Sequence, residues 1–280
     1  MPRAAALLCG GRSTRMGRPK ALLPWQGSTL VAHGVEKLRE VADHVYVVAS
    51  PELELPALRA RVLRDRDPHL GPLAGIREAL EAAAADAADA VFVTSTDAPF
   101  LTREFVERVF EIARGHRAAA PVVDGRVQPL GAVYSPALAS VADELLIADR
   151  RRPLFLLEQA DYRPIEPTEL PDLDSLRSLD RPEEYLAALA ENGPLGPATA
   201  EMFGLARTRS GVRETSVPAG HLRDALVDLH RRYPAMGILD GGKVSDAYLV
   251  SLDGRNFLTD PNVAIAPGDR LVFLDAATGG

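Results

Sequence analysis

Residues 4–20, AAALLCGGRSTRMGRPK, join an apolar run to a loop of glycines and basic side chains. The apolar run, residues 4–9, lacks polar alternation, which predicts a strand buried on both faces, as in a parallel sheet. Glycines let a loop backbone approach a ligand with its N–H groups, and arginine and lysine neutralise a polyphosphate chain. The stretch therefore predicts a strand that opens into a nucleoside triphosphate site.

Neither of two common phosphate-binding loops fits this stretch. A P-loop has Ser or Thr after its lysine, whereas Ala21 follows Lys20. A Rossmann loop has closely spaced glycines, whereas the first glycine after Gly11 is Gly17. Residues 8–20 instead resemble the signature of the GT-A-like nucleotidyltransferases, Leu-x-Gly-Gly-x-Ser-x-Arg-Met-Gly-x-x-Lys, and fit the molybdenum cofactor guanylyltransferases best within that group. The alternative is a glycine-rich surface loop with solvated arginines.

Composition and charge narrow the class of protein. The chain has 280 residues, of which 46% are hydrophobic and 25% charged, as in a globular protein long enough for two domains. Its net charge of -7 argues against a nucleic-acid partner, so the basic loop is a local patch suited to a small anionic substrate. No segment predicts a membrane span or a signal peptide, and no membrane partner is expected. Cys9, the single cysteine, permits no intrachain disulfide, which indicates a cytoplasmic protein, and its apolar surroundings predict a buried thiol.

Apolar runs alternate with segments of helical spacing along the first part of the chain. This alternation predicts an α/β fold with a doubly wound sheet, and the resemblance adds that the fold is GT-A-like and Rossmann-like. The expected strands are residues 4–9, 45–49, 61–63 and 91–94, and the expected helices are residues 30–41, an alanine-rich segment ending near 85, and a segment from Thr102 to about 114. Ligands of such sheets bind beyond the carboxyl ends of the strands, so the first loop and Asp97 are expected to meet in one crevice.

Asp97 follows the apolar strand 91–94 with small neighbours. Nucleotidyl transfer needs a divalent cation, and Mg²⁺ favours one or two carboxylates with water and substrate oxygens completing its shell. The alternative is an aspartate that stabilises the turn before Pro99. The resemblance implies that Asp97 is the metal-binding aspartate of the family.

Residues 71–75, Gly-Pro-Leu-Ala-Gly, match a segment of the guanylyltransferases whose backbone reads the base. Proline fixes the turn and glycine permits close approach, although a plain entry into a helix would use the same residues. Asp65 and Asp67, just upstream, could accept hydrogen bonds from guanine N1–H and its amino group. Solvated loop charges are an equal alternative for these two carboxylates.

Three sets of site residues are expected, from the resemblance and, for Asp65, from its chemistry as a hydrogen-bond acceptor. The catalytic residues are Arg15, Lys20 and Asp97, with Gly280 for the second domain. The nucleotide-binding residues are Leu8, Cys9, Gly10, Gly11, Ser13, Lys20, Asp65, Gly71, Pro72, Leu73, Ala74, Gly75 and Asp97. The metal ligands are Asp97 and Asp180. The chain departs from the family near Asp180, because Ser178 and Asp180 stand where the family has two asparagines. N-capping of the next helix explains Asp180 nearly as well as metal binding does.

A second domain is expected after residue 191. Residues 1–191 form the predicted nucleotidyltransferase domain, and residues 192–197 are rich in glycine and proline, as linkers are. In residues 198–280, the expected strands are 198–206, 212–217, 248–252 and 270–274, and the expected helix is 222–229. A hairpin, one helix and further strands in so short a segment predict a small α+β domain of the β-grasp type.

The chain ends in Thr278-Gly279-Gly280 after the last expected strand. This ending resembles the ubiquitin-like sulfur carriers, and among them the small subunit of molybdopterin synthase. Two glycines let an extended tail enter a narrow tunnel, where a terminal carboxylate would be adenylated and converted to a thiocarboxylate. The implied partners are an E1-like adenylyltransferase and the large subunit of molybdopterin synthase. A disordered glycine-rich end is the alternative.

Together the two resemblances imply a fusion protein of molybdenum cofactor biosynthesis. The first domain would transfer GMP from GTP to molybdenum-molybdopterin with Mg²⁺ as cofactor, releasing pyrophosphate, and the second would carry sulfur. One alternative is a molybdopterin cytidylyltransferase that uses CTP. The other is a sulfur carrier whose first domain serves only for docking.

Overall fold

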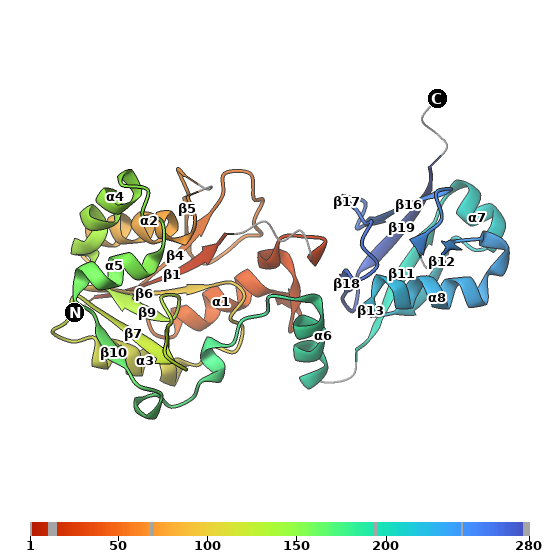
Figure 1. Ribbon diagram of the computed structural model, residues 1–280. Coiled ribbons are helices and arrows are strands. Elements are labelled where there is room, and N and C mark those ends of the chain that lie inside the picture. Colours follow the sequence, from red (N-terminus) through yellow and green to blue (C-terminus); the bar gives the residue numbers. More distant parts are fainter. Residues whose placement is uncertain (1, 11–15, 68–69, 193–194, 242, 277–280) are drawn as a thin grey trace. The chain divides into compact units, whose positions relative to one another are not determined.

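A computed structural model describes residues 2–10, 16–67, 70–192, 195–241 and 243–276 (Figure 1). The chain forms two compact units. The first unit comprises residues 1–12 and 20–178, and the second comprises residues 13–19 and 179–280. Within the described ranges, no helix is both long and apolar enough to span a membrane.

The first unit is built on one large sheet whose centre is β1 (Arg3–Cys9). β1 pairs in parallel with β4 (His44–Ala49) on one side and β6 (Ala90–Ser95) on the other. The strand order is β10-β7-β9-β6-β1-β4-β5, with β8 paired to β7. The remaining strands are β5 (Arg61–Arg64), β7 (Ala118–Val123), β8 (Arg126–Val127), β9 (Ala132–Tyr134) and β10 (Arg163–Ile165), and a separate small ribbon is formed by β2 (Pro24–Trp25) and β3 (Ser28–Thr29).

The sheet is mixed: β1 has parallel neighbours, as its apolar run predicts, whereas another strand runs the opposite way. β9 runs antiparallel to both β6 and β7. The connection from β7 to β9 holds only the short strand β8 and its turns, and a parallel pair needs a crossover of about a dozen residues or more. The chain between them is therefore too short to return to the other end of the sheet.

Helices cover both faces of this sheet, as the uninterrupted apolar run predicts. On one face α2 (Pro72–Ala85), α4 (Ala139–Ile147) and α5 (Pro153–Ala160) share a core with Ala4, Ala6 and Leu8 of β1. On the other face α1 (Leu30–Arg39) and α3 (Arg103–Ile112) share a core with Ala5, Leu7 and Cys9. Figure 1 shows these two helical layers on either side of the strands. Both faces of β1 are thus buried.

Side-chain caps set the starts of α1 and α3. Thr29 accepts a hydrogen bond from the backbone N–H of Ala32 at 3.4 Å, and Thr102 accepts one from Phe105 at 3.3 Å. Each threonine satisfies a backbone donor that the first helical turn leaves unpaired. Both predicted starts are confirmed, whereas the helices end at Arg39 and Ile112, about one half-turn earlier than expected.

The second unit has a sheet of order β12-β11-β19-β16-β17. Its two central strands, β11 (Pro197–Met202) and β19 (Arg270–Asp275), are parallel neighbours, and each pairs with an antiparallel strand on its other side. Helix α8 (Leu222–Arg232) shares a core with them. The other elements are α6 (Pro182–Glu191), α7 (Gly204–Ser210), β12 (Glu214–Pro218), β13 (Gly220–His221), β14 (Leu239–Asp240), β15 (Lys243–Val244), β16 (Tyr248–Leu252), β17 (Asn256–Phe257) and β18 (Ala264–Ile265).

One predicted strand of this unit is partly wrong. The segment 198–206 is a strand only as far as Met202, and helix α7 starts at Gly204. Gly204 has a φ of +47°, and the next N–H, that of Leu205, donates to Asp275 Oδ1 at 2.7 Å. A left-handed glycine breaks the strand, and a carboxylate distant in the sequence caps the helix that follows.

The predicted linker, residues 192–197, follows α6 and includes Pro197, which is already the first residue of β11, while residues 193 and 194 lie outside the described ranges. The second unit also contains α6, which the predicted boundary at residue 191 assigns to the first domain. The two units thus divide the chain between residues 178 and 179, whereas the predicted domains divide it after residue 191, and the independent folding of the predicted domains stays a prediction.

Candidate active site

Two of the predicted catalytic side chains lie in contact in the first unit. Lys20 opens the short 3-10 helix η2 (Lys20–Leu22), and Asp97 lies two residues beyond the end of β6. Lys20 Nζ donates to Asp97 Oδ2 at 2.9 Å, and the Ser95 hydroxyl donates to Asp97 Oδ1. The side chains of Lys20 and Asp97 are 17% and 20% exposed, so water and small ligands reach both. A cation and a carboxylate far apart in the sequence are thus held together at the edge of the sheet.

The register of the central strands explains why Asp97 lies there. Leu8 of β1 is paired with Ser95 of β6, and the Thr96 N–H donates to the Leu8 carbonyl at 3.2 Å. The two strands therefore end together, and the residues that follow them leave the sheet at the same edge. Gly10, just after β1, has open space where a side chain would be.

A side chain of α1 and an aromatic group support the loop after Asp97, and neither was predicted as part of the site. The His33 ring contacts the Pro99 carbonyl through Nε2 at 3.1 Å. Burial lowers the pKa of His33, which favours a neutral ring that donates from Nε2. The rings of Trp25 and Phe100 meet edge to face at 5.7 Å. The only hint of this support in the sequence was Trp25, the single tryptophan of the chain, which follows the signature loop closely.

Some predicted site residues lie outside the described ranges. They are Gly11, Ser13, Arg15 and Gly280. Leu8 and Cys9 are described, and the Leu8 side chain packs into one core of the first unit and the Cys9 side chain into the other, so these residues could bind a nucleotide only through their backbone.

Burial makes the Cys9 thiol unreactive. Desolvation raises the pKa of its thiol to about 12, which removes the thiolate at neutral pH. We expect a thiol reagent such as DTNB at pH 8 to leave the native protein unlabelled over minutes and to label one thiol after denaturation in guanidinium chloride. Rapid labelling of the native protein would contradict this placement of Cys9.

The segment 71–75 forms the start of α2. Gly71 is its N-terminal flanking residue with a φ of +83°, Pro72 is in the first turn, and no side chain caps the helix. Leu73, Ala74 and Gly75 are buried, and a side chain on Gly75 would press on Leu8 at 3.3 Å. This segment can therefore bind a ligand through its backbone and through the exposed Gly71 and Pro72, as the prediction of backbone reading requires.

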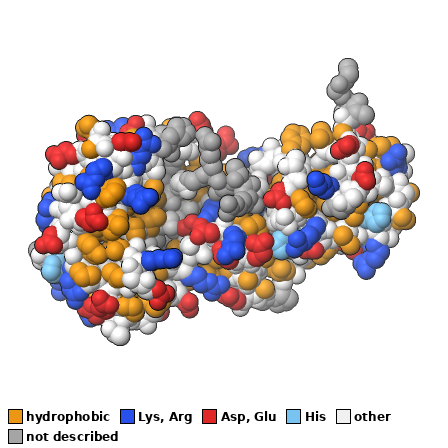
Figure 2. All heavy atoms as spheres, in the orientation of Figure 1, with side chains coloured by type: hydrophobic (Ala, Val, Ile, Leu, Met, Phe, Trp, Pro, Cys, Tyr) orange, Lys and Arg blue, Asp and Glu red, His pale blue; other side chains and the backbone are white. Residues whose placement is uncertain are grey.

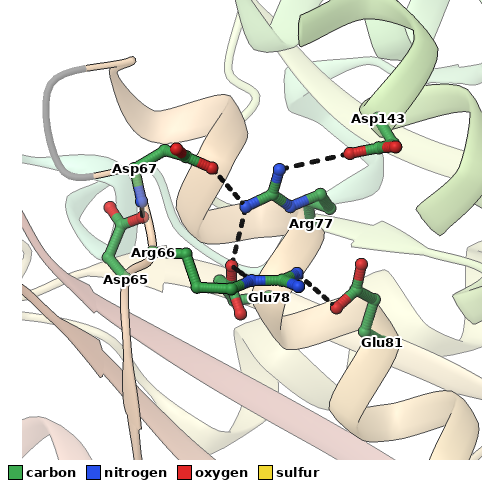
Figure 3. A network of polar contacts seen from close by, with 7 residues as sticks. All are labelled: Asp65, Arg66, Asp67, Arg77, Glu78, Glu81 and Asp143. Carbon is green, nitrogen blue, oxygen red and sulfur yellow. Dashed lines mark hydrogen bonds and ion pairs between the residues drawn. The ribbon is translucent and has the colours of Figure 1, made fainter. Parts of the chain in front are cut away.

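The two upstream carboxylates have different environments. Asp67 Oδ2 accepts from Arg77 Nη2 at 2.9 Å, so Asp67 is a half-exposed loop charge that is paired with an arginine (Figure 3). Asp65 Oδ1 accepts the Asp67 backbone N–H at 2.9 Å, and burial raises the pKa of Asp65. Asp65 Oδ2 accepts no hydrogen bond from any residue that the structure describes. Asp67 Oδ1 likewise accepts no hydrogen bond from the described residues, but the charge of Asp67 is paired with Arg77, whereas Asp65 forms no ion pair with any described residue. Asp65 is therefore the stronger candidate to bind a ligand.

The two predicted metal ligands belong to different units, Asp97 to the first and Asp180 to the second. Asp180 is exposed, and its backbone N–H donates to Glu184 Oε2 at 2.8 Å. The N-cap of α6 is Arg181, so the alternative of N-capping by Asp180 is wrong. Among the described residues, no group of three or more His, Cys, Asp and Glu side chains could hold a metal. Mg²⁺ is often bound by a single protein carboxylate, with substrate phosphates and water completing its coordination shell, and Asp97 fits that kind of site.

A separate cavity lies at the opposite edge of the sheet. It has a volume of about 450 Å³, and its lining includes Arg3 and Ala90, which begin β1 and β6. Lys20 and Asp97 follow the other ends of these strands, so this cavity is not part of the candidate active site.

Known proteins resemble the first part of the chain. Residues 5–162 match the family model of the MobA-like NTP transferase domain. A protein of Mycobacterium tuberculosis named "Probable molybdenum cofactor guanylyltransferase" is 41% identical over 166 residues, covering 58% of this chain and 82% of the relative. A protein of the same name from Carboxydothermus hydrogenoformans is 31% identical over 184 residues, covering 64% of this chain and 91% of the relative.

Among solved structures, a molybdopterin-guanine dinucleotide biosynthesis protein A from Archaeoglobus fulgidus aligns with a TM-score of 0.55 at 22% identity. The alignment covers 66% of this chain and 96% of that one, and at this identity it establishes the nucleotidyltransferase-like α/β fold alone. The family match goes further, because residues 5–162 include β1, the loop that follows it and Asp97, and the two relatives are 41% and 31% identical to this chain. The chain belongs to the family of MobA-like NTP transferases and is a nucleotidyltransferase.

Proposed function

We propose that the first unit transfers GMP from GTP to molybdenum-molybdopterin, giving the guanine dinucleotide cofactor and pyrophosphate. The observation that carries this proposal is the contact of Lys20 with Asp97 at 2.9 Å, beyond the ends of β1 and β6. The proposal is also supported by relatives that are named molybdenum cofactor guanylyltransferases. Molybdenum cofactor biosynthesis is the pathway that follows from these names.

Catalysis would consist of positioning and charge neutralisation, with no covalent intermediate. GTP would lie along the loop of residues 10–20, with Lys20 and Arg15 binding its phosphates. Asp97 would hold Mg²⁺, and the ion when bound would offset the negative charge of the phosphate oxygens. The terminal phosphate of molybdopterin would be the nucleophile, and pyrophosphate would leave.

Base selection would depend on Asp65 and the start of α2. A carboxylate accepts from both guanine N1–H and the guanine amino group, and Asp65 has an oxygen available for this. Cytosine offers one amino donor beside two acceptors, so the same carboxylate favours guanine. A cytidylyltransferase that uses CTP is the alternative of the same reaction class.

The pH dependence of GTP binding tests the role of Asp65. Only the ionised carboxylate accepts both guanine donors, and burial raises the pKa of Asp65. We expect the preference for GTP over CTP to be full at neutral pH and to fall with acidification, starting at a higher pH than for an ordinary aspartate. Calorimetric titration at several pH values measures this preference, and Asp65→Asn is the control that removes the dependence. An equal pH dependence in the Asp65→Asn variant would contradict the assignment.

The transfer reaction itself is the direct test. Purified protein is incubated with molybdenum-loaded molybdopterin, Mg²⁺ and either GTP or CTP, and the products are separated by chromatography and identified by mass. We expect GMP transfer with GTP preferred. Transfer of CMP instead would keep the reaction class and overturn the base assignment, and no transfer with either nucleotide would favour the docking alternative.

We further propose that residues 198–280 form a ubiquitin-like β-grasp domain that carries sulfur on Gly280. The specific observation in favour is the sheet, in which parallel central strands β11 and β19 are flanked by antiparallel strands and packed on α8. β19 ends at Asp275, shortly before the Gly279-Gly280 pair. The proposed partners are an E1-like adenylyltransferase and the large subunit of molybdopterin synthase, in a cytoplasmic setting that the single buried cysteine supports.

Mass spectrometry tests the sulfur-carrier proposal. It requires that Gly280 carries the terminal carboxylate of the purified protein. Incubation with an adenylating enzyme, ATP and a sulfur donor is expected to replace one oxygen by sulfur, a gain of about 16 Da on the C-terminal peptide. A variant without Gly280 is the control, and an unchanged peptide in the full-length protein would contradict the proposal.

A further inference from the structure

Arg77 is a buried arginine in the second turn of α2, and only 5% of the residue is exposed. Its Nη2 donates to Asp67 Oδ2 at 2.9 Å and to Glu78 Oε1 at 2.7 Å, and its Nη1 donates to Asp143 Oδ1 of α4 at 3.2 Å (Figure 3). Acidic and basic side chains are interspersed over the visible surface of the chain, where ion pairs contribute little to stability (Figure 2). Arg77 differs because a buried guanidinium is costly unless carboxylates surround it.

The contacts of Arg77 reach the candidate base-binding carboxylate in two steps. Arg77 holds the side chain of Asp67, and the backbone N–H of Asp67 donates to Asp65 Oδ1 at 2.9 Å. The backbone N–H of Asp65 in turn donates to the Ala49 carbonyl at the end of β4, also at 2.9 Å. The Asp65 carboxylate is therefore oriented by Asp67 on one side and by the edge of the sheet on the other.

A second clamp ties the same loop to the same helix. Arg66, between the two aspartates, donates from Nε to Glu78 Oε1 and from Nη2 to Glu81 Oε2, both at 2.6 Å. Glu78 Oε1 thus accepts from both Arg66 and Arg77 (Figure 3). Because α2 also begins with residues 71–75, one helix presents the exposed Gly71 and fixes the loop that carries Asp65.

We infer that Arg77 is a positioning residue for nucleotide selection, which holds Asp67 so that the Asp65 carboxylate meets the two donors of guanine. This inference rests on the proposed function, since it takes Asp65 as the group that binds the base. Arg77 itself touches no nucleotide. Removal of the Arg77 side chain should therefore change the preference for GTP over CTP far more than the rate at which a bound nucleotide reacts.

Substitution of Arg77 tests the inference through GTP and CTP binding. In Arg77→Met, we expect calorimetry with Mg²⁺ to give a loss of about 10- to 100-fold in the preference for GTP, the range for hydrogen bonds to a charged group. Arg77→Lys should recover part of the preference, because lysine restores the charge without the fork of donors. In the transfer assay KM for GTP should rise while kcat changes little.

Asp143→Asn is the matched control. It removes the charge of another carboxylate that pairs with the Arg77 guanidinium but leaves the contact between Arg77 and Asp67. The preference for GTP should therefore stay within about twofold of the wild type. Thermal unfolding checks that each variant folds. If Arg77→Met does not fold, Asp67→Asn replaces it, because this half-buried side chain can be changed without emptying the core and the preference for GTP should again fall.

The outcomes separate this inference from the proposed function. Wild-type protein that binds GTP over CTP but transfers no GMP would refute the proposed function, while the binding comparison would still decide the role of Arg77. An unchanged preference in Arg77→Met, or an equal loss for GTP and CTP, would overturn the inference. So would a wild-type protein that does not prefer GTP.

Discussion

Replacing Lys20 with alanine is expected to lower GMP transfer by about 10²- to 10³-fold, the usual effect of removing one preorganised donor from a transition state. Lys20 Nζ lies 2.9 Å from Asp97 Oδ2, so the charge is already in place before a nucleotide binds. Asp97→Ala should lower transfer at least as much, since it removes the candidate metal ligand. Initial rates of pyrophosphate release at saturating GTP measure both effects.

The fold should survive these two substitutions. The side chains of Lys20 and Asp97 are partly exposed, so water can solvate the partner that each substitution leaves, and the cost should be smaller than that of breaking a fully buried pair. Lys37→Ala, on α1, is the control for loss of a lysine and should transfer GMP at the wild-type rate. Transfer within about twofold of the wild type in both Lys20→Ala and Asp97→Ala would refute the mechanism.

The largest effect on stability is expected from Asp269→Asn in the second unit. Arg18 Nη2 pairs with Asp269 Oδ2, and the two side chains are only 9% and 4% exposed. Asp269 also accepts the Ala266 N–H at 2.7 Å, and burial raises the pKa of Asp269 although the Arg18 guanidinium opposes the rise. Without the Asp269 charge, the buried Arg18 guanidinium keeps the longer contact with the exposed Asp253, which compensates it poorly, and we expect a cost of about 3–5 kcal/mol. Urea unfolding of the purified protein measures the loss in the free energy of unfolding.

Asp253→Asn is the matched control for this prediction. Asp253 pairs with the same arginine at 3.5 Å, but its side chain is 45% exposed. Asparagine tolerates the φ of +55° at this position, so the substitution tests the charge alone. We expect a loss of about 1 kcal/mol or less. Equal losses in the two variants would mean that burial does not decide the strength of these pairs.

The sequence was sufficient to predict the centre of the fold. An apolar run without alternation predicted β1 correctly, because burial on both faces leaves a direct trace in composition. Thr29 and Thr102 predicted their helix starts, since capping depends on neighbours within one turn. The expectation that the first loop and Asp97 meet is supported by the contact of Lys20 with Asp97, whereas the roles of these residues stay predictions.

What the sequence did not predict depends on contacts between distant residues. The direction of β9 follows from pairing with β6 as well as β7, and α7 depends on a cap supplied by Asp275. Arg77 lies in an alanine-rich helix, where a single arginine is typical of a solvated face. Its burial is visible only once Asp143, 66 residues away, is placed beside it.

The parallel pairing of β11 and β19 has a mechanical consequence. A force that pulls β11 from Pro197 and β19 from Asp275 acts along both strands in opposite directions. The hydrogen bonds between them are then loaded in shear and must break together, rather than one after another as in unzipping. We expect single-molecule pulling through these two residues to give one high-force rupture of the second unit. A partner that pulls on the chain beyond Asp275 would therefore load β19 along its length, the direction in which this sheet resists most.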